Sequence, residues 1–438
     1  NKASTEETTN NVEPTSTFID WSKFNTQVSI YKYLTIFLIL AFNAGLICIM
    51  VMVDNGFWVA VPFILLTHVR DTLFLLAQFI LRKTWGGTET VTGKTIASSV
   101  PCYCESLDLI KENLNSLVNQ KRIWDNNTHL ILLALDGRVV GKGNTQCLED
   151  SLDNLLSEKT LLGNFEYKTW THNTCKSNVY SGKYNGHNVL VLAKQKNQGK
   201  KDSLVILRHV LRCLNTKKYT EDLTFFKNHF EQIGVEEAHY FFNTDADTVL
   251  DGDCLNHLAK SLDCHNEVDA VTGFVRAKTG GNFYWTSLQN FQYFLGQELR
   301  RNAESMWGKV TCLPGCVSMF NLSSSAGIEA EKEFVKTPND GSLLKTVNRM
   351  IGTDRRYTTL ILNSFANAKT VMIKDAIAYT GAPQSLSVFT SQRRRWSLNS
   401  LTNSFKLIMY GKLPIQTKLS AVVDILRLVA SYFRVVSY

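Results

Sequence analysis

Tyr240-Phe241-Phe242-Asn243-Thr244-Asp245-Ala246-Asp247-Thr248 is the stretch that decides the fold, because an apolar run there ends in two carboxylates separated by one alanine. The run is short enough to be a buried strand, and strand periodicity turns Asp245 and Asp247 toward the same side. Ligands of open α/β sheets gather outside the carboxyl ends of strands, where two oxygen donors suit Mg²⁺ or Mn²⁺ holding a diphosphate. The alternative is a solvated turn with a capping aspartate, so the neighbouring segments must decide.

The composition is that of a large globular domain with additional elements. The chain has 438 residues, of which 44% are hydrophobic and 20% charged. Its 47 basic and 39 acidic residues give a net charge of +8, and the basic residues are spread along the chain. This distribution favours small phosphate-bearing substrates or an anionic membrane face over nucleic acid. Ten cysteines without a Cys-x-x-Cys pair give little support to zinc or to a disulfide scaffold, and reduced thiols facing a cytosol are expected.

The N-terminal part is expected to cross a membrane twice. Residues 1–30 are polar and predict a flexible tail, and residues 31–83 predict a transmembrane helical hairpin. Leu34–Val53 is long enough to span a bilayer, and Phe57–Leu81 is again largely apolar. A buried pair of soluble helices is the alternative. Arg82 and Lys83 follow the hairpin and place the rest of the chain on the cytoplasmic side, as an integral membrane protein.

Residues 94–383 alternate between short β-rich runs and helical periodicity, the pattern of a mainly parallel α/β sheet. Strands are expected at 95–100, 129–135, 189–193, 240–243, 270–275 and 370–378. Helices are expected at 107–117, 147–162, 201–214, 287–307, 353–365 and 384–409. The polar and aromatic insertion near 163–187 has no interpretation from its pattern. Residues 384–411 form an amphipathic interfacial helix, and 412–438 begin a membrane-associated segment.

Three carboxylate sites lie at the tips of elements: Asp136, the pair Asp245 and Asp247, and Asp354. Together they fit nucleotide-sugar transfer, in which one acid holds the nucleoside, the pair holds a metal, and the third takes a proton from an acceptor hydroxyl. The loop Lys196–Lys201 runs into a helix N-terminus, which favours phosphate, although such loops are usually solvated turns.

Gln392-Arg393-Arg394-Arg395-Trp396 combines cations with an indole. Adjacent arginines on a helix point to different sides, so at most two can meet one ligand. The tryptophan can stack on a sugar ring while a guanidinium reaches phosphate. The alternative is a basic amphipathic helix lying on a membrane surface.

Several motifs occur together in one order, and as a set they resemble chitin synthase, among the processive membrane glycosyltransferases of family 2. The resemblance covers roughly residues 95–400. It rests on Leu135-Asp136-Gly137 followed by Gly141-Lys142-Gly143-Asn144, the loop Gln195–Ser203, Cys312-Leu313-Pro314-Gly315-Cys316, Asp354-Arg355, and Gln392 to Trp396.

The resemblance implies a nucleotide-sugar-binding fold of the GT-A type, with a mainly parallel sheet flanked by transmembrane and interfacial helices. The domain would lie on the cytoplasmic face of the plasma membrane. UDP-N-acetylglucosamine would be the donor and a chitin oligomer the acceptor, with Mg²⁺ or Mn²⁺ as the metal. A single displacement would invert the anomeric carbon and form a β-1,4 link. Membrane lipid is an expected partner and nucleic acid is not. The oligomeric state is left open, a homo-oligomer included.

The resemblance also implies roles for individual residues. On the donor side, Pro101, Tyr103, Glu105 and Asp136 would surround the uridine, Lys200 would approach the donor, Asp245 would touch the ribose or sugar, and Arg395 would hold the diphosphate. Asp247, together with Asp245, would bind the metal. Asp354 would be the general base. On the acceptor side, the expected residues are Cys316, Gln392 and Trp396.

The sequence departs from the family in two places. Thr353 stands where the family usually has Glu, and the loss of that carboxylate is expected to change the pKa of the neighbouring base. About 40 residues follow Trp396, so a chain ending at Tyr438 is expected to transfer sugars without the family's export channel. Two alternatives remain: a sibling enzyme that makes hyaluronan or another β-linked glycan, and a catalytically silent relative that binds sugar nucleotides.

Overall fold

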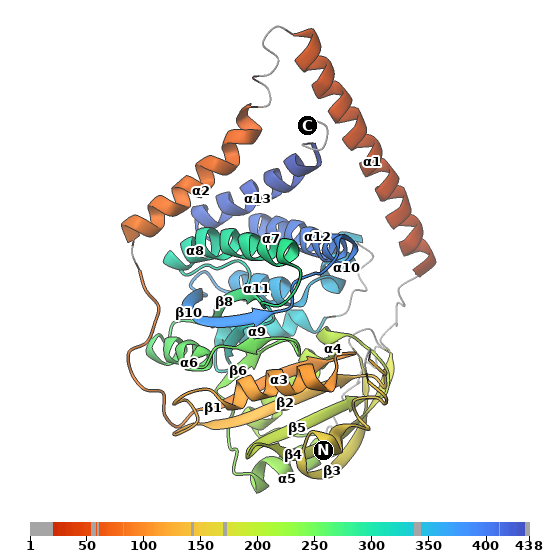
Figure 1. The fold of residues 1–438 in the computed structure, drawn as a ribbon, viewed down its shortest axis with the longest axis vertical. Coiled ribbons are helices and arrows are strands. Elements are labelled where there is room, and N and C mark those ends of the chain that lie inside the picture. Colours follow the sequence, from red (N-terminus) through yellow and green to blue (C-terminus); the bar gives the residue numbers. More distant parts are fainter. Residues whose placement is uncertain are drawn as a thin grey trace, which may run out of the picture.

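The structure is a computed structural model, and it describes residues 21–53, 58, 61–81, 83–141, 144–169, 173–336, 343–410 and 412–433 (Figure 1). The strands are β1 Thr95–Cys102, β2 Thr128–Asp136, β3 Ser157–Lys168, β4 Thr174–Tyr184, β5 His187–Lys194, β6 Tyr240–Asn243, β7 Val249–Leu250, β8 Ala270–Ala277, β9 Ser318–Asn321 and β10 Thr370–Thr380. The helices are α1 Trp21–Met52, α2 Val61–Leu81, α3 Leu107–Val118, α4 Lys200–Thr216, α5 Thr224–Gln232, α6 Cys254–Cys264, α7 Phe283–Phe294, α8 Asn302–Met306, α9 Ser325–Phe334, α10 Leu343–Met350, α11 Thr353–Ser364, α12 Leu386–Tyr410 and α13 Ile415–Phe433. Short 3-10 turns lie at Leu152–Asn154 and Glu221–Leu223.

The strands form one sheet in the order β3-β4-β5-β2-β1-β6-β9-β8-β10-β7. Parallel pairing joins β5, β2, β1 and β6 in the centre and joins β8 to β10. Strand β9 runs antiparallel to both of its neighbours, β6 and β8. The sheet is therefore mixed and mostly parallel, which confirms the sheet class predicted from the alternating pattern.

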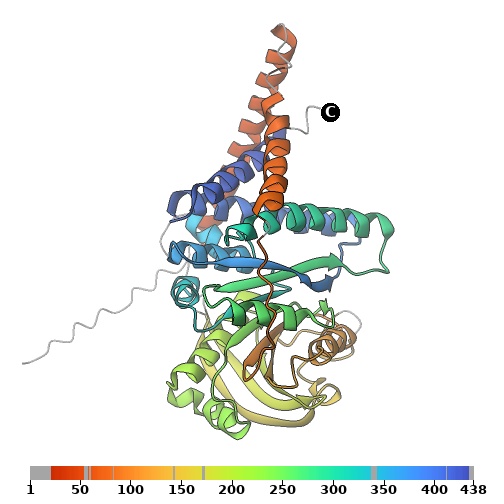
Figure 2. The ribbon, with the colours of Figure 1, turned by 90° about the vertical axis from the view of Figure 1, so that its left-hand side faces the viewer.

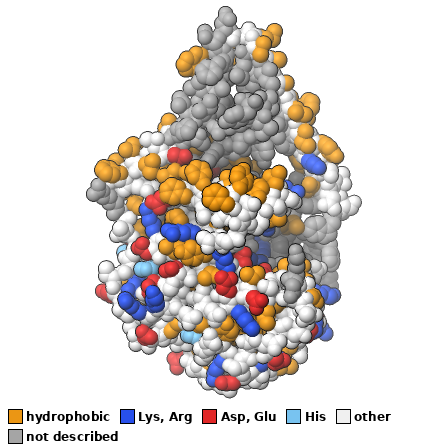
Figure 3. Space-filling view, in the orientation of Figure 1, with side chains coloured by type: hydrophobic (Ala, Val, Ile, Leu, Met, Phe, Trp, Pro, Cys, Tyr) orange, Lys and Arg blue, Asp and Glu red, His pale blue; other side chains and the backbone are white. Residues whose placement is uncertain are grey.

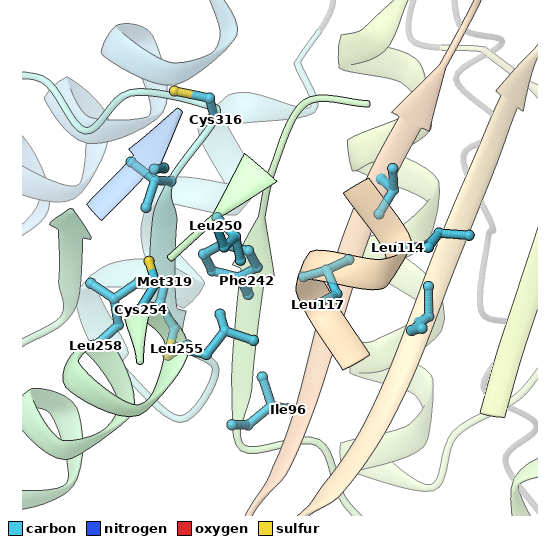
Figure 4. Packing of buried hydrophobic residues seen from close by; sticks show 14 of the residues in the cluster. Ile96, Leu114, Leu117, Phe242, Leu250, Cys254, Leu255, Leu258, Cys316 and Met319 are labelled. Atoms are coloured by element: carbon cyan, nitrogen blue, oxygen red, sulfur yellow. The ribbon is translucent and has the colours of Figure 1, made fainter. Parts of the chain in front are cut away.

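Helices cover both faces of the sheet, so the core has two halves. On one face, α3 and α6 bury Ile110, Leu114, Leu255 and Leu258 against the strands (Figure 4). Ile110 and Leu114 are four residues apart and Leu255 and Leu258 are three apart, and either spacing puts both residues on one side of a helix. On the other face, α4, α5, α9 and α11 form the second half of the core, where Phe241 of β6 is fully buried. A strand buried on both faces needs a continuous apolar run, which is what Tyr240–Phe242 supplies.

The segment near 163–187 is a β-hairpin that extends the sheet at its edge. Strands β3 and β4 pair in antiparallel fashion, and β4 then pairs with β5. Asn185 and Gly186 connect β4 to β5 with φ values of 48° and 85°, the positive values that a tight two-residue hairpin turn requires. The helix expected at 147–162 is wrong. Leu152, Leu155 and Leu156 are buried at helix-like spacing, but Ser157 already begins β3.

The long helix expected at 287–307 is interrupted by a π-helical segment, Leu295–Arg301, between α7 and α8. Within it, the buried Gln297 side chain accepts a hydrogen bond from the Val275 amide at 2.7 Å and donates one to the Val275 carbonyl at 2.8 Å. These bonds fix the helix to β8. A π-helical turn inside an α-helix is rare and often lies near a functional site.

Helices α1, α2 and α13 lie at one end of the molecule, away from the edge formed by β3 (Figures 1 and 2). Among the described residues, no helix combines the length and the apolar character that crossing a membrane needs. Residues 21–30, expected in the tail, belong to α1. Residues 1–20 of the predicted tail, Arg82, and residues 434–438 lie outside the described part of the chain.

Candidate functional site

The predicted site residues gather at one edge of the sheet, where β2 and β6 end and β9 begins. Because β9 runs antiparallel to β6, its first residue, Ser318, pairs with Asn243, the last residue of β6. The loop before β9 therefore reaches the edge at which Asp245 follows β6. Asp136 ends β2, which lies two strands from β6 with β1 between them. Two strand spacings amount to about 10 Å, which is enough for a nucleoside.

Asp245 and Asp247 lie in the turn that follows β6. Buried Asn113 of α3 holds this turn, since its side-chain amide donates to the Asp245 carbonyl at 3.1 Å and to the Thr248 carbonyl at 2.7 Å. Burial, and then the neighbouring Asp245 carboxylate, raises the pKa of Asp247 to about 6. Glu105 raises the same pKa further, whereas Lys278 lowers it. The turn therefore concentrates negative charge at the strand tip.

Lys200, the first residue of α4, connects two of the predicted carboxylate sites. Its ammonium forms an ion pair with Asp245 Oδ1. Burial opposes the charge of this ammonium, but the carboxylates of Asp245 and Asp354 outweigh burial and raise the pKa of Lys200 above its usual value. Asp245 and Asp354 thus share a single cation, although they are more than a hundred residues apart in the sequence.

Asp354 lies in the first turn of α11 and is fixed against the loop that precedes β9. The Gly315 amide donates to Asp354 Oδ2 at 3.1 Å, and the Leu313 amide donates to Thr358 Oγ1 at 3.2 Å. A Cβ at residue 315 would lie 3.2 Å from Asp354 Cγ and 3.1 Å from Lys200 Nζ. A side chain at this position would crowd both groups, so glycine favours the close approach of the loop, the base candidate and the lysine.

Cys316, also in this loop, faces the same group of carboxylates. Burial, and then Asp245, raises the pKa of the Cys316 thiol well above its ordinary value. The thiol is therefore neutral at physiological pH. Tyr293 of α7 lies partly buried against the same core cluster, and burial and then Cys316 raise the pKa of its hydroxyl.

The residues predicted around the nucleoside lie on and just after β1 and at the end of β2. Pro101 is within β1 and pairs with Ala134 of β2. The exposed Tyr103 follows the strand, and its backbone amide donates to Glu105 Oε2 at 2.6 Å. Asp136 is buried, accepts the Gln198 amide at 2.8 Å on Oδ1, and pairs with Lys194.

Helix α12 brings Trp396 toward the site from the side of α7. Trp396 is 40% exposed, and its ring lies 6.4 Å from the ring of Tyr293, measured between centroids. Tyr293 thus stacks near Trp396 and also lies within electrostatic range of Cys316. Arg395 is exposed, and no residue in the described part of the chain pairs with it. The side-chain oxygen of Gln392 is buried without a hydrogen-bond partner among the described residues.

Arg393, Gln289 and Tyr293 were not predicted as site residues. The guanidinium of Arg393 lies 4.4 Å from the centre of the Trp396 ring and donates to Gln289 Oε1 at 2.7 Å. The i, i+3 spacing of Arg393 and Trp396 on one helix is a signal that could have paired them. Gln289 and Tyr293 come from a different helix, and only the packing of α7 on α12 shows their role.

Asp245 and Asp247 fit a divalent metal that also binds phosphate. Two adjacent carboxylates, one of them with a raised pKa, form a site that gains from a neutralising cation. Mg²⁺ is commonly held by one or two carboxylates together with substrate phosphates. Within the described residues, no three His, Cys, Asp or Glu side chains gather closely enough to hold a metal by themselves.

A family model described as chitin synthase matches residues 75–425, which include every residue of this edge. The chain belongs to the chitin synthase family. Chitin synthase 8 of Gibberella zeae is 29% identical over 343 residues, which cover 75% of this chain and 51% of that protein. Chitin synthase 8 of Verticillium dahliae is 28% identical over 424 residues, covering 86% of this chain and 69% of that protein. The chain thus spans about half the length of the first of these relatives.

Among solved structures, a mannosyltransferase from Pyrobaculum calidifontis, in complex with GDP-Man and Mn²⁺, is similar to this chain. The TM-score is 0.50 at 16% identity, and the match covers 85% of each chain. This similarity supports a glycosyltransferase fold of the GT-A type for this member of the chitin synthase family.

Proposed function

We propose that the protein transfers N-acetylglucosamine from UDP-N-acetylglucosamine to the non-reducing end of a β-1,4-linked chitin chain, with inversion. The observation that carries the proposal is the meeting of Asp354, Lys200, Asp245 and the Gly315–Cys316 loop at one sheet edge. These groups come from four separate segments. Their convergence supplies a base, a cation for a leaving group and a metal-binding pair in a single site.

In the proposed reaction, Asp354 takes the proton of the acceptor 4-hydroxyl, and that oxygen attacks the anomeric carbon of the donor sugar. The bond from the anomeric carbon to the diphosphate breaks, and UDP leaves with the bonding electrons. The Gly315 amide occupies Oδ2 of Asp354, which leaves Oδ1 to act as the base. A divalent metal held by Asp245 and Asp247 supplies positive charge to the diphosphate when it is bound.

In this proposal, the donor nucleotide and the acceptor sugar are bound by different residues. The uridine lies between Tyr103 and Asp136, and the diphosphate lies beside Lys200 with Arg395 available from α12. The acceptor sugar stacks on Trp396, whose ring is partly exposed and held by Arg393. Cys316, a neutral thiol, lies between the two halves and contacts sugar without taking part in proton transfer.

The proposal is tested by measuring UDP release from the purified protein with UDP-N-acetylglucosamine, a chitin oligosaccharide and Mg²⁺. We expect release that requires the oligosaccharide and stops when EDTA removes the metal. A chitinase-sensitive product separates this activity from synthesis of hyaluronan or another β-linked glycan. Binding of the donor without release would instead identify a catalytically silent relative.

We also propose that the end of the molecule formed by α1 and α2 associates with a lipid bilayer, with the candidate site on the cytoplasmic side. Exposed apolar side chains such as Phe37, Leu40, Phe79 and Ile80 lie along these helices. Figure 3 shows hydrophobic side chains on the surface at this end of the molecule. Large exposed apolar surfaces mark contacts with membranes or with other proteins. Flotation with phospholipid vesicles tests this, and the double variant Phe79→Asp and Ile80→Asp should float less than the unchanged protein.

A further inference from the structure

Lys194, the last residue of β5, has a completely buried side chain that no mechanism above uses. Its ammonium lies 2.7 Å from Asp136 Oδ1 and 3.3 Å from Asp202 Oδ2, and it donates to the Gly199 carbonyl at 3.4 Å. The three N–H donors of a lysine thus all have acceptors. A buried ammonium is costly unless it is paired, so these contacts hold the two carboxylates and the loop at Gly199 together.

The two contacts of the Asp136 carboxylate fall on the same oxygen atom, Oδ1. Oδ1 accepts both the Lys194 ammonium and the Gln198 amide, the latter at 2.8 Å. Two donors on a single oxygen fix the rotation of the carboxylate. Among the described residues, no donor contacts the other oxygen, Oδ2. Asp136 therefore presents one acceptor oxygen, in one orientation, to a ligand at the end of β2.

The chain of contacts continues into the β3–β4 hairpin. The hydroxyl of Tyr167 on β3 donates to Asp202 Oδ2 at 2.8 Å, beside the contact from Lys194. Burial, and then Asp202, raises the pKa of Tyr167 above its ordinary value, so this residue remains a protonated donor. The hairpin is thereby connected to Asp136 through two buried side chains.

We propose that Lys194, Asp202 and Tyr167 are positioning residues that orient Asp136 to accept the N3–H of a uracil base. The proposal rests on the function proposed above and gives the β3–β4 hairpin a part in nucleotide selection. Uracil carries a hydrogen at N3, whereas N3 of cytosine is an acceptor that would face the carboxylate unfavourably. A carboxylate held in one orientation therefore discriminates between the two bases.

The test compares Lys194→Met, Asp202→Asn and Tyr167→Phe with the unchanged protein by titration with UDP, CDP and pyrophosphate in the presence of Mg²⁺. For Lys194→Met we expect the Kd for UDP to rise about tenfold or more, which is the loss of one hydrogen bond to a charged group. Pyrophosphate binding should change less than about twofold, and the preference for UDP over CDP should shrink. Tyr167→Phe should shift UDP binding in the same direction by a smaller factor.

Two controls come from the same hairpin. Tyr184→Phe removes a tyrosine hydroxyl at the end of β4. This hydroxyl hydrogen-bonds Asn115 at 2.9 Å and is not part of the Lys194–Asp202–Tyr167 network. Lys176→Met removes an exposed lysine paired with Glu166. Both variants should bind UDP and CDP as the unchanged protein does. Should Lys194→Met not fold, as judged by its thermal melt, the milder Asp202→Asn and Tyr167→Phe variants decide the test.

Turnover gives the second measurement. In folded variants, the KM for UDP-N-acetylglucosamine should rise while kcat at saturating donor stays within about threefold, because the network acts on binding of the base and not on the displacement. Equal weakening of UDP and pyrophosphate, or an unchanged ratio of UDP to CDP affinity, would overturn the proposal. If the unchanged protein binds UDP but releases none from the donor, the proposed enzyme activity fails while the binding comparison still decides this inference.

Discussion

Asp354 is the residue on which the proposed chemistry depends most directly. Its Oδ2 accepts the Gly315 amide, and its charge contributes to the raised pKa of Lys200. These contacts orient the carboxylate without occupying Oδ1. A residue placed in this way can be changed with little effect on donor binding, because the donor contacts lie on other segments.

Asp354→Asn should therefore abolish transfer while donor affinity is nearly retained. The side chain keeps its shape and can still accept the Gly315 amide, but it cannot take a proton. We expect UDP release to fall by a factor of about a hundred to ten thousand, the usual contribution of a general base. Titration calorimetry should give a Kd for UDP-N-acetylglucosamine within about threefold of the original. Asp375→Asn, at an exposed position of β10, is the control, and equal loss of binding and transfer would remove Asp354 from the base role.

Arg393→Met should weaken acceptor binding specifically. The guanidinium stacks on Trp396 and is anchored by Gln289, so its loss frees the indole to leave the site. We expect the KM for a chitin oligosaccharide to rise by about three- to tenfold, the size of a cation–π contact, with the Kd for UDP unchanged. Arg394→Met provides a matched control, because Arg394 is exposed on the same helix. A similar rise in both variants would mean that positive charge, and not the stacked ring, determines acceptor binding.

At the scale of residues, the sequence could predict site residues whose chemistry is visible in a motif. The Asp-x-Asp pair, Asp354 and Lys200 each follow a recognisable break between elements, and the structure brings them to one edge. Lys194 was not identified, although a lysine that ends the apolar run Val189–Ala193 is unusual. Its partners Asp202 and Tyr167 belong to other elements, so no local pattern could reveal the network.

At the scale of elements, strands with continuous apolar runs were predictable and the β3–β4 hairpin was not. Its strands alternate polar and apolar residues at the sheet edge, and Asn185-Gly186 was the signal that could have revealed the turn. The apolar spacing within 147–162 favoured a helix locally, but pairing of β3 with β4 determined the outcome. Similarly, the π-helical segment follows from the Gln297 contact with β8, which is not encoded in the spacing of α7.

A buried histidine at the start of β2, His129, should make the stability of the protein sensitive to mild acid. His129 is buried, stacks on Trp124 at 3.9 Å between ring centroids, and contacts Ser98 Oγ at 2.9 Å. Burial, and then His187, lowers the pKa of His129 well below its ordinary value of 6.5. The unfolded chain therefore binds more protons than the folded one just below pH 6.5, so the free energy of unfolding decreases as the pH falls through that value.

Thermal melts at pH 7.5 and 5.5 check this expectation. His129→Phe keeps an aromatic ring against Trp124 and removes the proton-binding group. The decrease in Tm on acidification should be smaller in this variant than in the unchanged protein. His257→Gln on α6 is the control and should retain the full decrease. An identical decrease in all three proteins would exclude His129 as the source of the acid sensitivity.

At the scale of the whole molecule, a buried ion pair joins the C-terminal helix to the candidate site. Arg300, in the π-helical segment, pairs with Asp424 of α13 and with Glu304 at 2.9 Å, and it donates to Thr311 Oγ1 at 3.1 Å. Thr311 immediately precedes the Cys312–Cys316 loop. The position of α13 is therefore connected to the acceptor side of the site through a single guanidinium.

Asp424→Asn should loosen α13 before it affects the sheet. The change removes the charge that faces Arg300, which keeps its ion pair with Glu304, and losing a hydrogen bond between charged groups typically costs about 1.5–3 kcal/mol. Hydrogen exchange should show faster exchange in α13, Ile415–Phe433, with β1 and β2 still protected. Gln416→Ala, an exposed position on the same helix, should leave the exchange pattern unchanged. Uniform acceleration across the sheet would show that α13 does not open separately.

The antiparallel strand β9 also limits where the chain can tolerate insertions and deletions. Only four residue pairs, from Tyr240 with Asn321 to Asn243 with Ser318, join β9 to β6. Sliding one strand past the other by a single residue would shift the attached loop by about 3.4 Å and turn every side chain of β9 to the opposite face. Insertions or deletions within 310–321 should therefore eliminate activity even in proteins that still melt cooperatively, so natural and engineered length variation belongs elsewhere in the chain.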